Sequence, residues 1–274
     1  MITMTDKEFN TLTTFVKQNY GIDLSKKRIL IEGRLSNTLS ARGISSFEEY
    51  MDLVFRDKSG QEIKVLLNKL TTNHTFFLRE SEHFQFLQQH VLPYLVKQRS
   101  NSKDLRIWSA GCSTGQEPYT MAMAIADFFG NQSGTWDTTI LATDLSTQVL
   151  DQARSGIYSA ESLKDVPPEW RRKYFIDKND GTFEVCDRIK KEVVFRHANL
   201  MEPFSYKKPF DMIFCRNVMI YYDAQTKNNL VNKFYNCTAG GGFLFIGHSE
   251  TINRETTKYR YIKPAVYQKG ENAR

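Results

Sequence analysis

The stretch from Leu105 to Met121, LRIWSAGCSTGQEPYTM, most constrains what this chain can fold into. It predicts a buried strand, then a turn of small residues from Ser109 to Gly115, then a helix that begins near Glu117–Pro118. Open α/β sheets build nucleotide-type pockets in this way, because glycines allow close approach and the first N–H groups of a helix are free. The spacing is G-x-x-x-G, which differs from the G-x-G-x-x-G of dinucleotide-binding proteins, so a tight turn without a ligand stays open as an alternative.

After residue 104 the chain alternates between apolar segments of strand length and amphipathic helices. This alternation is typical of an α/β protein with a mostly parallel, doubly wound sheet. Gly156 to Lys191 departs from it: an Asp180-Gly181 turn between strand-like runs predicts a small inserted β-subdomain, with a long ordered loop as the equal alternative. The expected strands are Leu105–Ala110, Thr139–Thr143, Val193–His197, Phe210–Cys215, Gly242–Gly247 and one or two within Tyr259–Lys269; the expected helices are 117–129, 146–154 and 223–237.

The first hundred residues show a different pattern, since residues 5 to 99 are helical in their periodicity. Gly21 and Gly43 are expected to end the first two helices. The segment TTNHTFFLRE has no clean period, and its Phe76 is expected in the helical core. The fifth helix, up to Gln98, is expected to be interrupted at Pro93. The expected helix starts are Thr5–Asp6, Ser25, Ser46 with Glu49 in a capping box, Gln61 and Ser81.

Composition narrows the class of protein. No apolar run approaches the roughly 18 residues that span a membrane, and the N-terminus MITMTDKEF lacks an apolar signal core, so a cytoplasmic protein is expected. The four cysteines form no C-x-x-C pair and the five histidines no metal-ligand spacing, so neither a disulfide framework nor a metal is expected. A net charge of +6 favours an acidic partner but is too diffuse to indicate nucleic acid.

Several polar residues follow predicted strands or begin predicted helices. Asp144, after the second strand, is placed to accept both ribose hydroxyls of a nucleoside, or to cap the next helix. Glu117, at a helix start, is placed to hold a cationic ligand group, although the helix dipole alone would also stabilise a carboxylate there. Arg216-Asn217 and Asn199-Leu200 follow later strands and fall at the ligand-binding edge, or are simply polar strand ends.

The region around the second helix is rich in cations. Lys27, Arg28 and Arg34 are set against the single acidic residue Glu32. Such a run is most often a solvated face, and the alternative is a surface that docks an acidic helix or nucleic acid.

Five motifs occur in order along the chain: TTNHTFFLRE–SEHF, WSAGCSTGQEPYT, LATDLS, FDMIFCRNVMIYYD and GFLFIGHSE. Together they resemble the chemotaxis receptor methyltransferases of the CheR family, over nearly the whole chain. The resemblance implies a small all-helical N-terminal domain and a Rossmann-like methyltransferase domain with an inserted β-subdomain. In this chain we expect the helical domain over 1–80, a connecting helix and linker over 81–104, and the methyltransferase domain over 105–274 with 156–191 inserted.

The resemblance also implies an activity: methylation of glutamate side chains on bacterial chemoreceptors, with S-adenosylmethionine as the cofactor and S-adenosylhomocysteine as the product. The partner would be the cytoplasmic helical bundle of a chemoreceptor, docked on Lys27, Arg28 and Arg34. Tyr221, Tyr222, Arg79 and Arg99 are candidates for orienting the acceptor, with Arg79 and Tyr222 preferred. The cofactor contacts implied are Asn73, Thr75, Arg79, Gly111, Glu117, Asp144, Asn199, Leu200, Arg216 and Asn217.

Some family members grip a tether peptide at the receptor C-terminus with a glycine-containing loop of the β-subdomain. The corresponding loop here, Ile176 to Thr182, is short and has one glycine, so we expect an enzyme that does not use the tether. Separately, we expect a monomer. Two other functions stay open: a nucleic-acid methyltransferase, and a non-catalytic signalling module that binds the cofactor.

Overall fold

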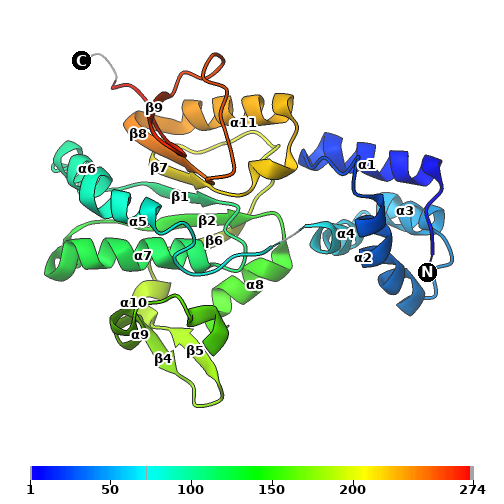
Figure 1. The fold of residues 1–274 in the computed structure, drawn as a ribbon, viewed down its shortest axis with the longest axis horizontal. Coiled ribbons are helices and arrows are strands. Elements are labelled where there is room, and N and C mark those ends of the chain that lie inside the picture. The colour runs from blue at the N-terminus through cyan, green and yellow to red at the C-terminus, as the bar shows by residue number, and fades with distance from the viewer. Residues whose placement is uncertain (1, 72, 272–274) are drawn as a thin grey trace.

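The computed structural model describes residues 2–71 and 73–271, and its helical N-terminal part stands beside an α/β part (Figure 1). The N-terminal helices pack their apolar faces together around Leu12, Ile31, Leu35 and Tyr50, at the spacing that the sequence predicts. These helices are α1 (Asp6–Tyr20), α2 (Arg28–Ala41), α3 (Phe47–Arg56) and α4 (Gln61–Leu70).

The helix ends follow the predicted caps in part. Thr5 and Glu8 form a capping box at α1, which ends at Gly21 in the left-handed conformation. Ser46 caps α3, but the Glu49 carboxylate accepts from the backbone N–H of Ser45, one residue before the cap. The expected cap at Ser25 is wrong: the backbone N–H of Ser25 donates to the Asp23 side chain, and α2 begins three residues later.

A broken helix connects the two parts, as α5 (Glu82–Phe86), the π-helical turn η1 (Leu87–Val91) and α6 (Leu92–Gln98). The sequence predicts an interruption at Pro93, and the π-helical turn lies just before it. Proline has no N–H to donate to the preceding turn, so the helix widens there.

The central sheet has the strand order β6-β2-β1-β7-β8-β10-β9. The first five strands in this order are parallel, whereas β10 is antiparallel to both neighbours, which makes the sheet mixed. Strand β8 is longer than expected because it begins at Thr238 and pairs with Phe210 through a register shift. The strands are β1 (Ile107–Ala110), β2 (Ile140–Asp144), β6 (Val193–His197), β7 (Phe210–Cys215), β8 (Thr238–Ile246), β9 (Arg260–Lys263) and β10 (Val266–Gln268).

Helices cover both faces of this sheet (Figure 1). One face presents Ile107, Met212 and Phe245 to a core formed with α5, α6, α7 (Gln116–Phe129) and α8 (Thr147–Ser155). The other face presents residues such as Trp108 and Ile213 to α11 (Ala224–Cys237). Neighbouring strand residues thus point to opposite cores, as strands buried on both faces require. Short 3₁₀ turns are η2 (Gly130–Thr135) and η4 (Met219–Tyr221).

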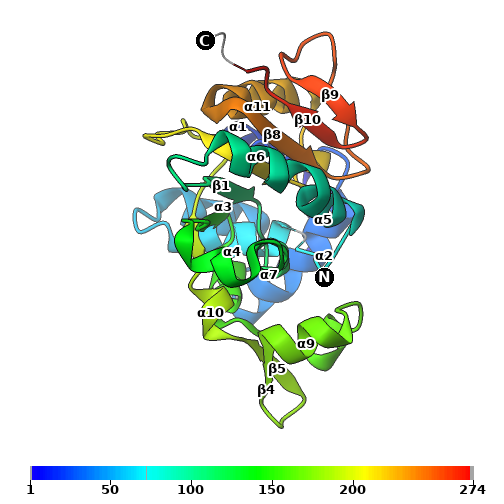
Figure 2. The same cartoon turned by 90° about the vertical axis from the view of Figure 1, so that its left-hand side faces the viewer.

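The segment between α8 and β6 is a small β-subdomain that projects beside α7 (Figures 1 and 2). Its sheet has the order β3-β5-β4, and the Asp180-Gly181 turn joins β4 to β5 in the predicted hairpin. Trp170 and Tyr174 anchor it by donating to Asp127 of α7. The alternative of an ordered loop is therefore excluded. Its elements are β3 (Ile157–Ser159), η3 (Ala160–Leu163), α9 (Pro168–Tyr174), β4 (Phe175–Asp177), β5 (Thr182–Val185) and α10 (Asp187–Lys190).

None of the helices within residues 2–71 and 73–271 has the length and apolar character needed to cross a membrane.

Candidate active site

A cavity opens at the carboxyl edge of the sheet, where the strand order reverses between β1 and β7. Ligands of open α/β sheets bind at this kind of position. The turn after β1 and the ends of β2, β6 and β7 form one wall, and the helical part with the segment after α4 forms the other. The cavity brings together all the residues expected to contact a cofactor, namely Asn73, Thr75, Arg79, Gly111, Glu117, Asp144, Asn199, Leu200, Arg216 and Asn217.

Close packing fixes the glycine turn, whose Gly111 lines the cavity. Gly111 and Gly115 both have a positive φ, of 90° and 93°. An added Cβ at Gly111 would lie 2.3 Å from Cγ2 of Val218, and one at Gly115 would lie 2.9 Å from Cβ of Ala153. The backbone N–H groups of Gly111 and Cys112 donate to the Thr143 carbonyl. The glycines are therefore required by the fold of the turn, and these N–H groups are not free for a ligand.

Asp144 ends β2 and faces the cavity. Its Oδ2 accepts from the backbone N–H of Ser113 at 2.8 Å and its Oδ1 from that of Ser146 at 2.9 Å. Ser146, and not Asp144, caps α8, because its Oγ accepts from the Val149 N–H. Burial raises the pKa of Asp144, and the backbone donors oppose that rise. Each carboxylate oxygen keeps a lone pair that a hydroxyl donor can use.

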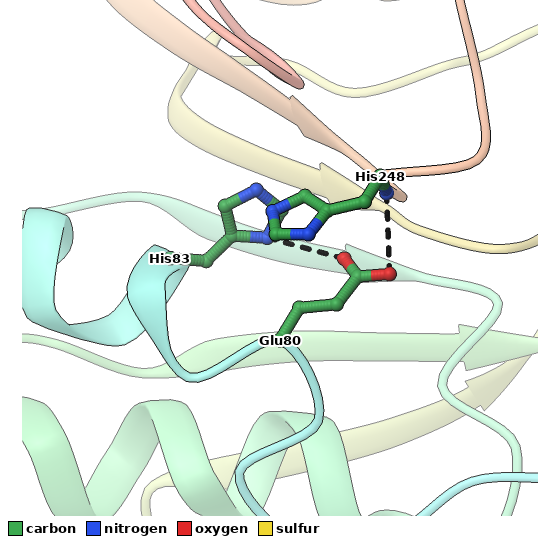
Figure 3. A group of neighbouring side chains, drawn as sticks. All are labelled: Glu80, His83 and His248. Atoms are coloured by element: carbon green, nitrogen blue, oxygen red, sulfur yellow. Dashed lines mark hydrogen bonds and ion pairs between the residues drawn. The ribbon is translucent and has the colours of Figure 1, made fainter.

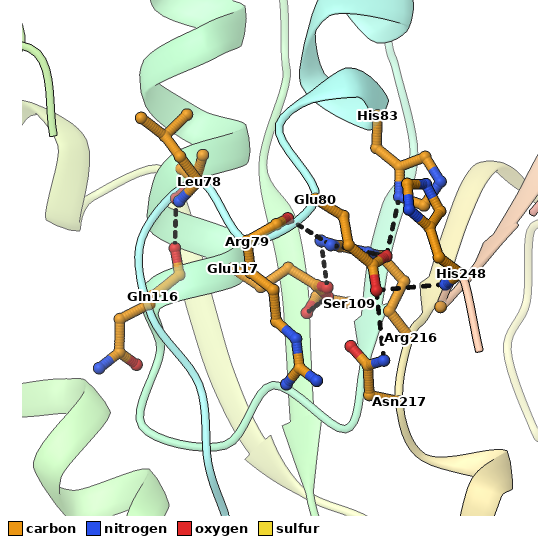
Figure 4. Close-up of polar contacts among 12 residues, drawn as sticks. Leu78, Arg79, Glu80, His83, Ser109, Gln116, Glu117, Arg216, Asn217 and His248 are labelled. Carbon is orange, nitrogen blue, oxygen red and sulfur yellow. Dashed lines mark hydrogen bonds and ion pairs between the residues drawn. The ribbon is translucent and has the colours of Figure 1, made fainter. Parts of the chain in front are cut away.

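A buried guanidinium joins the two walls. Arg216, after β7, places Nη1 3.2 Å from Oε2 of Glu117 and Nη2 3.1 Å from Oε2 of Glu80 (Figure 4). Arg216 also donates to the carbonyl of Arg79. Ser109 Oγ donates to the second oxygen of Glu117 at 2.7 Å. The Arg216 guanidinium thus pairs with a carboxylate of helix α7 and with a carboxylate of the segment after α4.

The two acids have opposite pKa shifts. Burial raises the pKa of Glu117, which lies at the start of α7. Burial also acts on Glu80, but Arg216, the backbone N–H of His248 and the amide of Asn217 favour its charged form and hold its pKa below the usual value. Glu80 is therefore an ionised anchor, although the sequence prediction did not include it. The signal was present, since Glu80 directly follows Arg79 in the TTNHTFFLRE segment.

The segment after α4 has an unusual backbone. Leu78 and Glu80 have φ values of 59° and 54°, and across the cavity Ser113 and Asn217 have 49° and 58°. Positive φ is costly for Leu, Glu and Ser and persists where surrounding contacts impose it, whereas Asn tolerates it more readily. Glu80 illustrates this, because its carboxylate is held by Arg216 and by the backbone N–H of His248. Backbone strain at Leu78, Glu80 and Ser113 thus lies beside the cavity.

The residues expected to orient an acceptor separate into two groups. Arg79 and Tyr222 line the cavity, as does Tyr221. Arg79 donates to the His74 carbonyl at 2.8 Å and lies over the Phe76 ring. Arg99 is wrong as a candidate, because it pairs with Asp211 at the opposite end of β7.

Phe76 is likewise misassigned by the sequence interpretation. It is 36% exposed and lines the cavity, whereas Phe77, beside it, is buried against Tyr158 and Phe175. Period-based reasoning could not separate these two neighbours, because the segment that carries them is neither helix nor strand.

Several contacts fix the helical part against the sheet. Ile22 forms an antiparallel bridge with Tyr222, and Lys17 pairs with Asp223 at 2.8 Å. The Asn199 amide donates to the carbonyl of Asn19 at 2.8 Å. Each of these pairs joins the end of α1, or the residues just after it, to a loop at the carboxyl edge.

The three cations expected to dock a partner have different surroundings. Lys27 is exposed and lines the cavity. Arg28 pairs with Asp6 and lies over the Phe9 ring. Arg34 donates to the carbonyls of Leu70 and Thr71, so it ties α2 to the end of α4.

Comparison with known proteins identifies the chain. Residues 73–267 match the family described as "CheR methyltransferase, SAM binding domain", and residues 7–71 match "CheR methyltransferase, all-alpha domain". The chain belongs to the CheR methyltransferase family. Its cofactor is S-adenosylmethionine, and its cavity lies at the edge of the sheet where the predicted cofactor residues meet.

Curated relatives match this chain over nearly its full length. A chemotaxis protein methyltransferase of Borreliella burgdorferi is 44% identical, over 98% of this chain and 96% of the relative. One of Escherichia coli is 35% identical, over 97% and 92%. Among solved structures, an amino pentose methyltransferase of Micromonospora echinaspora covers 70% of this chain and 62% of its own at 16% identity and a TM-score of 0.35.

Proposed function

We propose that this CheR-family protein transfers the methyl group of S-adenosylmethionine to glutamate carboxylates of bacterial chemoreceptors, giving glutamate methyl esters and S-adenosylhomocysteine. The observation that carries the proposal is the arrangement in which Arg216 joins Glu117 to Glu80 across the two walls of the cavity. The names of the relatives, chemotaxis protein methyltransferases, support methyl transfer to a protein of chemotaxis.

The donor set of the cavity fits the cofactor. Asp144 would accept the two ribose hydroxyls with its remaining lone pairs. Glu117 would attract the cationic end of the cofactor, and Arg216 would bind its carboxylate. Asn199, Leu200 and the segment from Asn73 to Arg79 would enclose the remainder.

The acceptor needs no general base. A glutamate side chain has an unperturbed pKa of about 4.3 and is ionised at neutral pH. Its carboxylate oxygen attacks the methyl carbon, the carbon–sulfur bond breaks, and the electron pair stays on sulfur. The attack neutralises both charges, so the protein's task is alignment and removal of water, not stabilisation of separated ions.

Two residues of the cavity wall are suited to orient the acceptor. The Arg79 guanidinium would hold the attacking carboxylate loosely, since it already lies at the wall beside Phe76. Burial raises the pKa of Tyr222, so its hydroxyl stays protonated and would donate to the same carboxylate.

The helical part would dock the receptor. Lys27 and Leu30 line the cavity, and Ile29 beside them is 86% exposed. A cation next to exposed apolar side chains suits a receptor helix that carries glutamates and apolar residues. Of the three cations, Lys27 is best placed to meet it, because Arg28 and Arg34 already contact groups of the helical part.

The experiment is methyl transfer from S-adenosylmethionine labelled in its methyl group, offered to membranes that contain chemoreceptors. We expect label on the receptor, released as volatile methanol by alkali, and none on a receptor whose acceptor glutamates are replaced by glutamine. Label on nucleic acid would favour a nucleic-acid methyltransferase. Cofactor binding without any turnover would favour a non-catalytic module.

A further inference from the structure

Three potential metal ligands, Glu80, His83 and His248, meet between the segment after α4, helix α5 and the turn after β8 (Figure 3). Glu80 comes from the segment after α4, His83 from α5, and His248 from the turn after β8. One ligand atom of each lies within 4.8 Å of those of the other two. None of the three residues lines the cavity, although Glu80 pairs with Arg216 and so anchors the segment that forms one cavity wall.

His83 is the unexplained member of this cluster. Its side chain is fully buried, and neither ring nitrogen has a hydrogen-bond partner among the described residues. Oε2 of Glu80 lies 3.5 Å from Nδ1, which is too long for a good hydrogen bond. A buried polar group without a partner is costly, and native proteins rarely keep one without a reason.

Packing fixes the orientation of the His83 ring. It lies edge-to-face against Phe245 and His248, with ring centroids 5.6 Å and 4.7 Å apart, which limits its rotation. A neutral imidazole held in this way offers one lone pair to a metal ion.

We propose that Glu80, His83 and His248 bind a transition-metal ion such as Zn²⁺, with solvent as the fourth ligand. Bonds of about 2.0–2.2 Å in a tetrahedral site separate neighbouring ligand atoms by roughly 3.4 Å. The 3.5 Å between Nδ1 of His83 and Oε2 of Glu80 already matches that separation. His248 is exposed, so its side of the site is open to solvent.

The Glu80 carboxylate would exchange one hydrogen bond for the metal ion. It accepts two bonds at Oε2, from Nε and Nη2 of Arg216, and two at Oε1, from the Asn217 amide and the backbone N–H of His248. A metal ion at Oε2 would take the place of the longer Arg216 bond, the one from Nε at 3.3 Å. Arg216 is neutralised in part by Glu117, so it would act as an outer hydrogen-bond donor that orients the ligating carboxylate. Two imidazoles and one carboxylate favour Zn²⁺ and its neighbours over Mg²⁺ and Ca²⁺, which prefer oxygen ligands.

The proposal goes beyond methyl transfer and does not depend on it. The sequence offered a partial signal in Glu80-x-x-His83, but the third ligand is 165 residues further along the chain, so sequence spacing alone could not indicate it. The folding of β8 against α5 brings His248 to the other two.

The test is titration of the intact, metal-stripped protein with Zn²⁺ in competition with a chromogenic chelator. The wild type should bind one Zn²⁺ per chain, and His248→Asn should bind it at least about tenfold more weakly, a loss of about 1.4 kcal/mol. His248 is exposed, so this variant keeps the test valid even if His83→Asn fails to fold.

His90→Asn is the matched control, because His90 is also exposed but lies outside the cluster. It should bind Zn²⁺ like the wild type, which also accounts for any binding by the four cysteines. Absence of Zn²⁺ binding by the wild type, or equal affinities of the wild type and His248→Asn, would overturn the proposal.

Discussion

The two walls of the cofactor cavity are built in different ways. The sheet wall consists of strand ends whose positions follow from parallel pairing, such as Ala110 opposite Thr143. The wall formed by residues 73–81 has no helix or strand, and its Leu78 and Glu80 have positive φ values. It is attached to the α/β part by the buried Phe77 ring, and to the sheet wall by a few polar contacts, chiefly Arg216 with Glu80 and Ser113 with the Asn73 carbonyl.

The two walls therefore have different roles. The sheet wall supports the cavity, and the wall formed by residues 73–81 closes it. Strand ends held by a hydrogen-bonded ladder keep their geometry when one side chain changes. A segment held by individual polar contacts is expected to loosen when one of them is removed, because local stability follows the local contacts. The segment from Asn73 to Glu80 is therefore the part of the site that cofactor binding would order, and the sheet edge is the part that is already formed.

The largest expected effect comes from Arg216→Ala, which removes the group shared by the two walls. The change leaves Glu80 and Glu117 without their cation, in positions where both side chains are largely buried. Removing one partner of a buried ion pair costs about 3–5 kcal/mol. Urea denaturation should show a loss of that size.

Arg154→Ala is the matched control, since Arg154 pairs with Asp151 on the exposed face of α8. Its loss should stay below about 1 kcal/mol, as for other surface pairs. Equal losses in the two variants would mean that Arg216 does not join the walls.

The next effect in size comes from Glu80→Gln, which keeps the shape of the anchor and removes its charge. The charge-assisted bond with Arg216 weakens, and the amide that replaces the carboxylate must face donors that need an acceptor. Ordering the segment then costs binding energy, so the affinity for S-adenosylmethionine should fall about tenfold, or about 1.4 kcal/mol. Calorimetry measures this directly.

Glu82→Gln removes the same charge two residues away, on the exposed start of α5. It should bind the cofactor like the wild type. A Glu80→Gln variant with undiminished affinity would contradict the role of the segment in closing the site.

The smallest effect concerns the acceptor side. Lys27→Glu reverses an exposed charge at the cavity, so it should slow receptor methylation a few-fold at low salt and less at high salt, without changing cofactor affinity. Lys58→Glu makes the same change in net charge in the exposed turn before α4 and should leave the rate unchanged. An effect of equal size in both variants would point to net charge and not to docking.

The sequence predicts the sheet wall well because its signals are local. Strand-length apolar runs that end in Asp144 or in Arg216-Asn217 place these residues at one edge, whatever the distant contacts are. The same reasoning predicts the hairpin at Asp180-Gly181, since the turn chemistry and the flanking runs agree.

The role of the wall formed by residues 73–81 could be predicted only from the resemblance to the CheR family. Nothing in the periodicity of TTNHTFFLRE shows that Phe76 faces the cavity while Phe77 enters the core, or that Glu80 pairs with a residue 136 positions later. Arg99 shows the opposite error, because a cation close in sequence to the site lies at the far end of the sheet. Contacts between distant segments decide these positions.

Hydrogen exchange of the intact protein, with and without S-adenosylhomocysteine, tests the two-wall account most directly. The account predicts that ligand strongly slows exchange in residues 73–81 and changes the ladder of β1, β2 and β7 little, since those strands are already hydrogen-bonded. Unchanged exchange in residues 73–81 at saturating ligand, with protection confined to the sheet edge, would contradict it.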